Sequence, residues 1–237
     1  MSVDYTLKDK YNIEDLIDIM KILRAPGGCP WDAEQDHESI KKNFIEETYE
    51  VVEAINKSDS ELLKEELGDV LLQVVFHAAM EEEKGVFNFD DVADGICKKL
   101  IIRHPHVFSN VQVVGTDDVL TNWDAIKRST KHQKSTTEAM ASVPRELPAL
   151  MRSEKLQSKA AKNGADIDNA VSYVAEKADR LQNEVSEENI GNLLFAAVAL
   201  ARKNKIDPED ALTKTADKFL KDFEAFEKGE SGNTLYN

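Results

Sequence analysis

Cysteine is scarce in this chain, and its placement excludes two structural classes. The 237 residues include only Cys29 and Cys97, which are far apart and form no Cys-x-x-Cys pair. A disulfide framework and a cysteine zinc site both need more cysteines at closer spacing. The sequence therefore predicts a protein that depends on a hydrophobic core and resides in a thiol-tolerant compartment, the cytoplasm.

Long apolar runs and a positive balance of charge are also missing. The most apolar stretches, 70–80 and 193–201, are interrupted or too short to span a bilayer, and the N-terminal region lacks a signal-peptide core. The formal net charge is −15, whereas a nucleic-acid surface needs a clustered excess of Lys and Arg. We therefore expect no membrane segment and no nucleic-acid partner, and any phosphate site must carry its own local positive charge.

Strand signals are weak, and apolar residues recur with helical spacing along most of the chain. Ser58 or Ser60 is placed to cap the third helix, and Ser58 and Glu61 have the spacing of a capping box. The fold class is therefore all-α, built as helical bundles. The expected helices cover about 13–23, 38–56, 61–84, 90–102, a segment from 116, 149–163, 168–184, 187–204 and 208–228.

A polar segment followed by two prolines predicts a boundary between two domains. We place a linker at 131–148, which contains Pro144 and Pro148. The first domain then covers 1–130 and the second covers 149–237.

The second domain resembles a degenerate copy of the first. Glu66-Leu67-Gly68-Asp69 in the first domain is echoed by Asn189-Ile190-Gly191-Asn192 in the second. A looser match upstream sets Lys177 and Arg180 opposite Glu47 and Glu50. Amides and cations are poor replacements for carboxylates on a hard cation, so we expect one active domain and one structural domain.

Two short acidic motifs carry the chemistry of the first domain. Glu46-Glu47-Thr48-Tyr49-Glu50 and Glu66-Leu67-Gly68-Asp69 lie on consecutive expected helices. Residues three positions apart project from one helix face, so antiparallel packing of the two helices would gather four carboxylates. Mg2+ prefers oxygen ligands and works alongside substrate phosphates. The motifs predict a metal-dependent phosphate enzyme, and a solvated acidic surface is the alternative interpretation. The expected metal ligands are Glu47, Glu50, Glu66 and Asp69.

Further motifs lie outside the acidic pair. Residues 24–32 read Arg-Ala-Pro-Gly-Gly-Cys-Pro-Trp-Asp and are followed by Gln35, His37 and Ser39-Ile40. Residues 103–108 read Arg-His-Pro-His-Val-Phe, and residues 122–127 read Asn-Trp-Asp-Ala-Ile-Lys. Together with the acidic motifs, these segments resemble the MazG-type nucleoside triphosphate pyrophosphohydrolases. The resemblance spans residues 12–228.

This resemblance implies tandem all-α domains that form a homodimer and hydrolyse nucleoside triphosphates to the monophosphate and pyrophosphate. Mg2+ is the implied cofactor, with Mn2+ as a substitute, and it maps onto Glu47, Glu50, Glu66 and Asp69. The implied biological role is control of nucleotide pools, including the removal of noncanonical triphosphates. The residues implied to contact the nucleotide are Lys99, Arg103, Trp123 and Lys127.

Charge neutralisation sets the expected mechanism. A cation between the carboxylates and the phosphates lowers the pKa of a bound water, and Lys99 with Arg103 can hold the departing pyrophosphate. The proton of that water goes to a carboxylate, for which Glu46 and Glu50 are the candidates. For Trp123 the functional interpretation is stacking on a base, which any base tolerates, and core packing is the alternative.

Three other functions stay open at this point. One is a narrower pyrophosphatase acting on dUTP, dCTP or phosphoribosyl-ATP. Another is a helical nucleotide-sensing or interaction module that turns over nothing. The last is a di-iron protein, suggested by the Glu-x-x-His spacing of Glu34 and His37. That class needs two such motifs on core helices, and the chain offers one beside a Pro- and Gly-rich loop.

Overall fold

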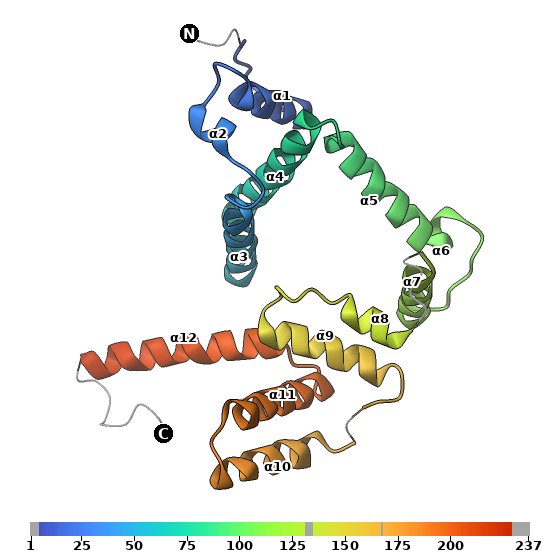
Figure 1. Cartoon of the computed structure of the whole chain (residues 1–237), viewed down its shortest axis with the longest axis vertical. Helices are drawn as coiled ribbons and strands as arrows, with labels where there is room; N and C mark the ends of the chain where they lie inside the picture. The colour runs from blue at the N-terminus through green and yellow to red at the C-terminus, as the bar shows by residue number, and fades with distance from the viewer. Residues whose placement is uncertain (1–4, 131–134, 167, 229–237) are drawn as a thin grey trace. The chain divides into compact units, whose positions relative to one another are not determined.

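The structure is a computed structural model that describes residues 5–130, 135–166 and 168–228. These residues form 12 α-helices and no strand (Figure 1), which confirms the all-α prediction. The chain divides into two compact units, Met1–Leu120 and Thr121–Asn237. None of the helices in the described ranges combines the length and apolar character that a bilayer crossing requires.

The first unit is organised around a pair of neighbouring antiparallel helices, α3 and α4. Helix α1 packs on α4, α2 packs on α1, and α5 follows α4 and carries α6 at its end (Figure 1). The elements are α1 (Ile13–Arg24), α2 (Pro30–Glu34), α3 (Lys41–Lys57), α4 (Ser60–Glu83), α5 (Phe89–Arg103) and α6 (Pro105–Phe108), followed by α7 (Thr116–Thr130), which continues into the second unit.

A very short turn joins α3 to α4. Ser58 takes a left-handed conformation with φ 54° and ends α3, and the Asp59 side chain then accepts hydrogen bonds from the backbone N–H groups of Glu61 and Leu62, both at 3.1 Å. Asp59 is therefore the N-cap of α4, and the predicted caps at Ser58 or Ser60 were wrong. Ser58 cannot serve because its backbone is used to reverse the chain.

The core of the first unit lies between α1, the residue before α3, and the C-terminal half of α4. Six buried side chains form it: Met20, Ile40, Val75, Phe76, Ala79 and Met80. The N-terminal half of α4 packs against α3 instead, and this part of the hairpin leaves large apolar side chains exposed. They include Ile45, Tyr49, Val52, Ile55 and Leu67.

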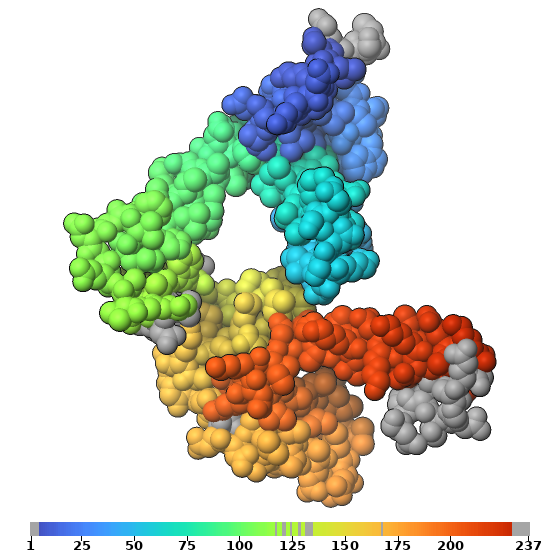
Figure 2. Space-filling view, turned by 180° about the vertical axis from the view of Figure 1, so that it is seen from behind, coloured from blue at the N-terminus to red at the C-terminus, as the bar shows by residue number. Residues whose placement is uncertain are grey.

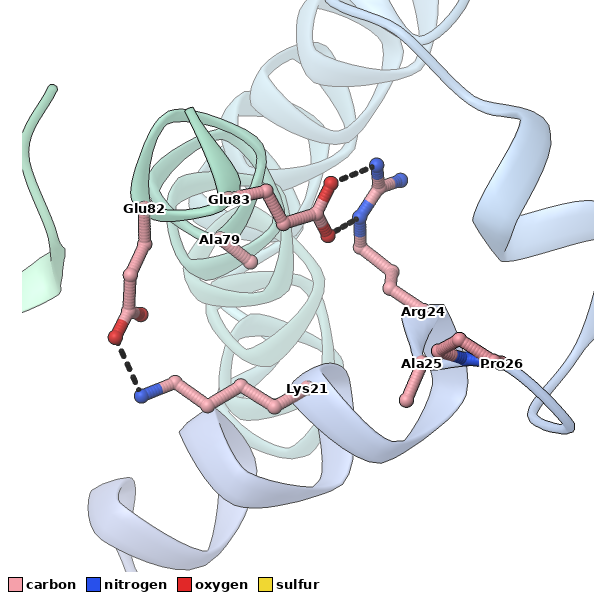
Figure 3. Close-up of a pocket in the computed structure, with 7 residues that line it drawn as sticks. All are labelled: Lys21, Arg24, Ala25, Pro26, Ala79, Glu82 and Glu83. Carbon is pink, nitrogen blue, oxygen red and sulfur yellow. Dashed lines mark hydrogen bonds and ion pairs between the residues drawn. The ribbon is translucent and has the colours of Figure 1, made fainter. Parts of the chain in front are cut away.

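Arg24 fixes the loop between α1 and α3. Its guanidinium donates to the carbonyl oxygens of Asp32 (2.5 Å) and Gln35 (3.2 Å) and forms a two-point ion pair with Glu83 (Figure 3). The Arg24 side chain is only 6% exposed, whereas the neighbouring Lys21–Glu82 pair is open to solvent. Both pairs line a cavity of about 420 Å³ between α1 and α4.

The second unit repeats the helix order of the first. Helices α10 and α11 form a hairpin like α3 and α4, and α9 packs on α11 as α1 packs on α4. Helix α12 follows α11 as α5 follows α4. The bounds are α8 (Thr136–Ala141), α9 (Ala149–Ala161), α10 (Ala170–Asn183), α11 (Glu187–Lys203) and α12 (Pro208–Glu227).

The predicted domain bounds are not settled by this division. The boundary between the two units falls inside α7, and residues 131–134 of the predicted linker lie outside the described residues. The rest of the segment 131–148 includes helix α8, in which Ala139 is buried, and the buried Val143. The division into 1–130, 131–148 and 149–237 stays a prediction.

Replacement of Arg24 by Ala should destabilise the first unit by about 2–3 kcal/mol, because two inward carbonyl groups lose their donor. Urea denaturation measures the change. The matched control is Lys21→Met, which breaks a solvent-exposed pair on the same two helices and should cost less than about 0.5 kcal/mol. Equal effects of the two changes would show that Arg24 is an ordinary surface residue.

Candidate active site

The hairpin of α3 and α4 gathers the acidic motifs. Glu47 on α3 and Glu66 and Asp69 on α4 each offer a carboxylate oxygen, and these atoms lie within 4.8 Å of one another. All three side chains are half-buried. Glu50 is exposed, and its carboxylate contributes to the raised pKa of both Glu47 and Glu66. We call these four residues the carboxylate cluster.

Within the part of the chain that the structure describes, the charged groups that shift the pKa of Glu47 and Glu66 are carboxylates. Burial, the hydrogen bond with Glu50 and the charge of Asp69 raise the pKa of Glu47. Burial and the charges of Glu50 and Asp69 likewise raise the pKa of Glu66. Each carboxylate thus makes it harder for its neighbours to ionise. An oxygen-only ligand set of this kind fits a hard divalent cation, so these residues can bind a metal.

Lys99 and Arg103 lie four positions apart near the end of α5. Figure 1 shows α5 leaving the hairpin at the C-terminal end of α4, whereas Glu66 and Asp69 lie near its N-terminal end. Arg103 is half-buried and has a partner. Within the first unit the chain therefore does not bring these two cations to the carboxylate cluster.

The other predicted site residues are Trp123, Lys127 and Glu46. Trp123 and Lys127 are half-buried on α7, have interaction partners, and fall in the second unit. Glu46 is exposed on α3, on the helix that also carries Glu47. Their roles in substrate binding and proton transfer stay predictions.

Sequence reasoning missed a second polar group in the first unit. His37 from the loop before α3 contacts His77 and Glu81 of α4. The available signal was weak, because these residues are far apart in sequence and only His77 and Glu81 share a helix face. Among the described residues, Glu47, Glu66 and Asp69 are the three ligands that converge, and no such set contains Glu34 or His37, so the di-iron interpretation has no support.

The equivalent hairpin of the second unit places cations beside its carboxylate. Lys177 and Arg180 of α10 both pair with Glu176, at 3.0 and 2.7 Å. The hydrogen bond from Lys177 lowers the pKa of Glu176, the opposite of the shift at Glu47. Asn189 and Asn192 stand on α11. The second hairpin thus needs no cation for charge balance.

Fold and site together define an all-α protein with a carboxylate set that can hold a metal. Residues 35–108 match the family model described as the MazG nucleotide pyrophosphohydrolase domain. The nucleoside triphosphate pyrophosphohydrolase of Escherichia coli K12 is 42% identical over 229 residues, which cover 91% of this chain and 87% of that protein. The chain belongs to the MazG family of nucleotide pyrophosphohydrolases, a family of hydrolases, as its motifs predicted.

Two other relatives have similar coverage of this chain. The nucleoside triphosphate pyrophosphohydrolase/pyrophosphatase MazG of Thermotoga maritima is 40% identical over 223 residues, covering 91% of this chain and 85% of that protein. The protein of Bacillus subtilis called uncharacterized protein YabN is 46% identical over 223 residues. That match covers 89% of this chain but only 45% of YabN.

The raised pKa values predict that the metal-free protein gains stability when one cluster charge is removed. A carboxylate whose pKa is raised by folding destabilises the native state as pH rises through that raised value. Glu47→Gln should therefore increase the Tm in EDTA by about 2 °C at pH 7, and the gain should shrink as the pH falls through the raised pKa of Glu47. Thermal unfolding followed by circular dichroism measures it.

The control for this measurement is Glu53→Gln, because Glu53 is exposed on the same helix and pairs with Lys57 at 2.6 Å. This change should leave the Tm unaltered or slightly lower. A lower Tm for Glu47→Gln than for the native chain at pH 7 would contradict the conclusion that the carboxylates of the cluster repel one another.

Proposed function

We propose that this chain hydrolyses nucleoside and deoxynucleoside triphosphates to the monophosphate and pyrophosphate, with Mg2+ bound by the carboxylate cluster. The observation that carries the proposal is the convergence of Glu47, Glu66 and Asp69 on one half-buried point of α3 and α4. Relatives named as nucleoside triphosphate pyrophosphohydrolases match most of the chain. Mn2+ has the same preference for oxygen ligands and should substitute.

The chemistry requires a water to add to phosphorus while the bond between the α- and β-phosphates breaks and pyrophosphate leaves with the bonding electrons. Mg2+, when bound, neutralises phosphate charge and lowers the pKa of a bound water. Glu47, Glu66 and Asp69 would hold the ion. We assign the proton of the water to Glu50 rather than Glu46, because Glu50 acts on the pKa of Glu47 and Glu66 yet stays exposed to solvent.

Substrate contacts follow from the family resemblance. Lys99 and Arg103 would bind the pyrophosphate, since a guanidinium can donate to two oxygens at once. Trp123 would stack on the base and Lys127 would contact the nucleotide from the next turn of α7. Stacking tolerates any base, which suits a broad enzyme that controls nucleotide pools and removes noncanonical triphosphates.

Exposed apolar side chains support a homodimer. Helix α3 exposes Ile45, Tyr49, Val52 and Ile55 at 45–57%, and large contiguous apolar surfaces on isolated chains mark protein contacts. Helix α5 carries a second such set, Ile96, Leu100, Ile101 and Ile102. Burial of these faces against a second copy would remove them from water. The two free cysteines, Cys29 and Cys97, fit a reducing cytoplasm.

Product analysis with a panel of NTPs and dNTPs tests the reaction. We expect monophosphate and pyrophosphate in the presence of Mg2+ and no product in EDTA. Diphosphate and phosphate would reject the proposed bond cleavage. Rapid turnover of a single substrate such as dUTP would replace the broad enzyme by a narrower one, and binding without turnover would favour a nucleotide-sensing module.

Glu47→Gln and Asp69→Asn should each lower kcat/KM by roughly 100-fold or more, because each removes a charged ligand of the ion. Steady-state kinetics at limiting Mg2+ measures the loss. Asn192→Ala is the matched control, since Asn192 occupies the position of Asp69 in the second hairpin, and it should keep near-normal activity. Near-normal turnover in either ligand variant would place the active site elsewhere.

A further inference from the structure

Three polar side chains connect the loop before α3 to α4, at the end of the hairpin opposite its turn. His37 lies in the loop just before α3, and its Nδ1 is 2.7 Å from Nδ1 of His77. The other ring nitrogen of His37, Nε2, is 2.6 Å from Oε1 of Glu81. Glu81 also pairs with Lys84 at 2.6 Å. We call His37, His77 and Glu81 the histidine link.

The two histidine rings meet at their edges. Their planes differ by only 11°, and the ring centroids are 5.0 Å apart although the facing nitrogens are 2.7 Å apart. Such head-on nitrogens have room for a proton between them but not for a metal ion, which needs about 2.0–2.1 Å to each nitrogen. The contact between His37 and His77 is therefore a hydrogen bond.

This hydrogen bond fixes the protons of both rings. Glu81 accepts from the Nε2–H of His37, so a neutral His37 has a free lone pair on Nδ1, and His77 donates its Nδ1–H to that lone pair. One added proton fits on Nε2 of His77. A second would place two N–H groups face to face and break the contact. Burial and the charge of His37 lower the pKa of His77, which disfavours the doubly charged pair.

The carboxylate cluster lies between the histidine link and the turn of the hairpin. The Ser58–Asp59 turn closes one end of the hairpin, and the histidine link closes the other. Phe44 on α3 packs beside His77 with ring centroids 5.9 Å apart, and Glu47 follows one helical turn later. Repulsion within the carboxylate cluster acts to separate α3 from α4, and these two ends resist it.

We infer that His37 and His77 are positioning residues that hold Glu47 on α3 at metal-binding distance from Glu66 and Asp69 on α4. This inference rests on the proposed metal site. The other charged groups around the link are Asp36, beside His37, and Lys84. Glu82 and Glu83, also on this end of α4, reach toward α1 and pair with Lys21 and Arg24 (Figure 3).

The test is the affinity of the full chain for Mn2+ alone, measured by isothermal titration calorimetry at pH 7.5. His77→Leu keeps the bulk and removes the hydrogen bond, and it should weaken binding roughly 10-fold, the usual effect of losing a group that orients a ligand. His77→Asn places an amide near the position of Nδ1 and should restore affinity to within about twofold of the native chain. Lys21→Met is the control and should bind like the native chain.

The pH profile separates positioning from simple stabilisation. Acidification adds a second proton to the histidine pair and opposes their hydrogen bond, so native affinity should fall more steeply with decreasing pH than that of His77→Asn, whose amide does not titrate. Parallel profiles would overturn the inference. An affinity of His77→Leu for Mn2+ equal to that of the native chain would also overturn the inference, whether or not the Tm of this variant is lower. Failure of the native chain to bind Mn2+ would instead overturn the proposed metal site, and the inference with it.

Discussion

Mutual repulsion within the carboxylate cluster is the constraint on which the site depends. Two antiparallel helices hold Glu47, Glu66 and Asp69 within 4.8 Å of one another, and the raised pKa values of Glu47 and Glu66 record the unfavourable charge. Helix packing must supply the free energy that opposes this repulsion before any cation binds. The core on α1 and the C-terminal half of α4 provides it, away from the carboxylates.

The second unit shows what the same hairpin is like without that constraint. Its helices α10 and α11 pack as α3 and α4 do, yet Lys177 and Arg180 neutralise Glu176. The fold of the hairpin therefore does not require a metal. Because the same helix pairing forms with both charge patterns, folding of the hairpin does not require the acidic set, which supports its proposed role in metal binding.

Much of the fold could be predicted, because long amphipathic helices leave a strong periodic signal. The short helices α2, α6 and α8 have too few turns to show one, and Pro30 and Pro105, which suggest breaks, begin two of them. The cap at Asp59 depends on which residue reverses the chain. The carboxylate cluster followed from spacing, whereas the histidine link did not, since His37 and His77 are brought together only by the packing of a loop on α4.

Binding of a triphosphate at the carboxylate cluster would require positive charge that the α3–α4 hairpin does not place there. The chain has a net charge of −15, the carboxylate cluster is anionic, and a triphosphate would add further negative charge. The cations that the proposed function assigns to the phosphates, Lys99 and Arg103, lie in the C-terminal part of α5, where the apolar residues Leu100, Ile101 and Ile102 are also exposed. A protein surface that packs on this part of α5 would bury the apolar residues and would also restrict the positions of the two cations. Under the proposed function, in which Lys99 and Arg103 bind the pyrophosphate and the chain forms a homodimer, a second copy on this part of α5 would also complete the phosphate site.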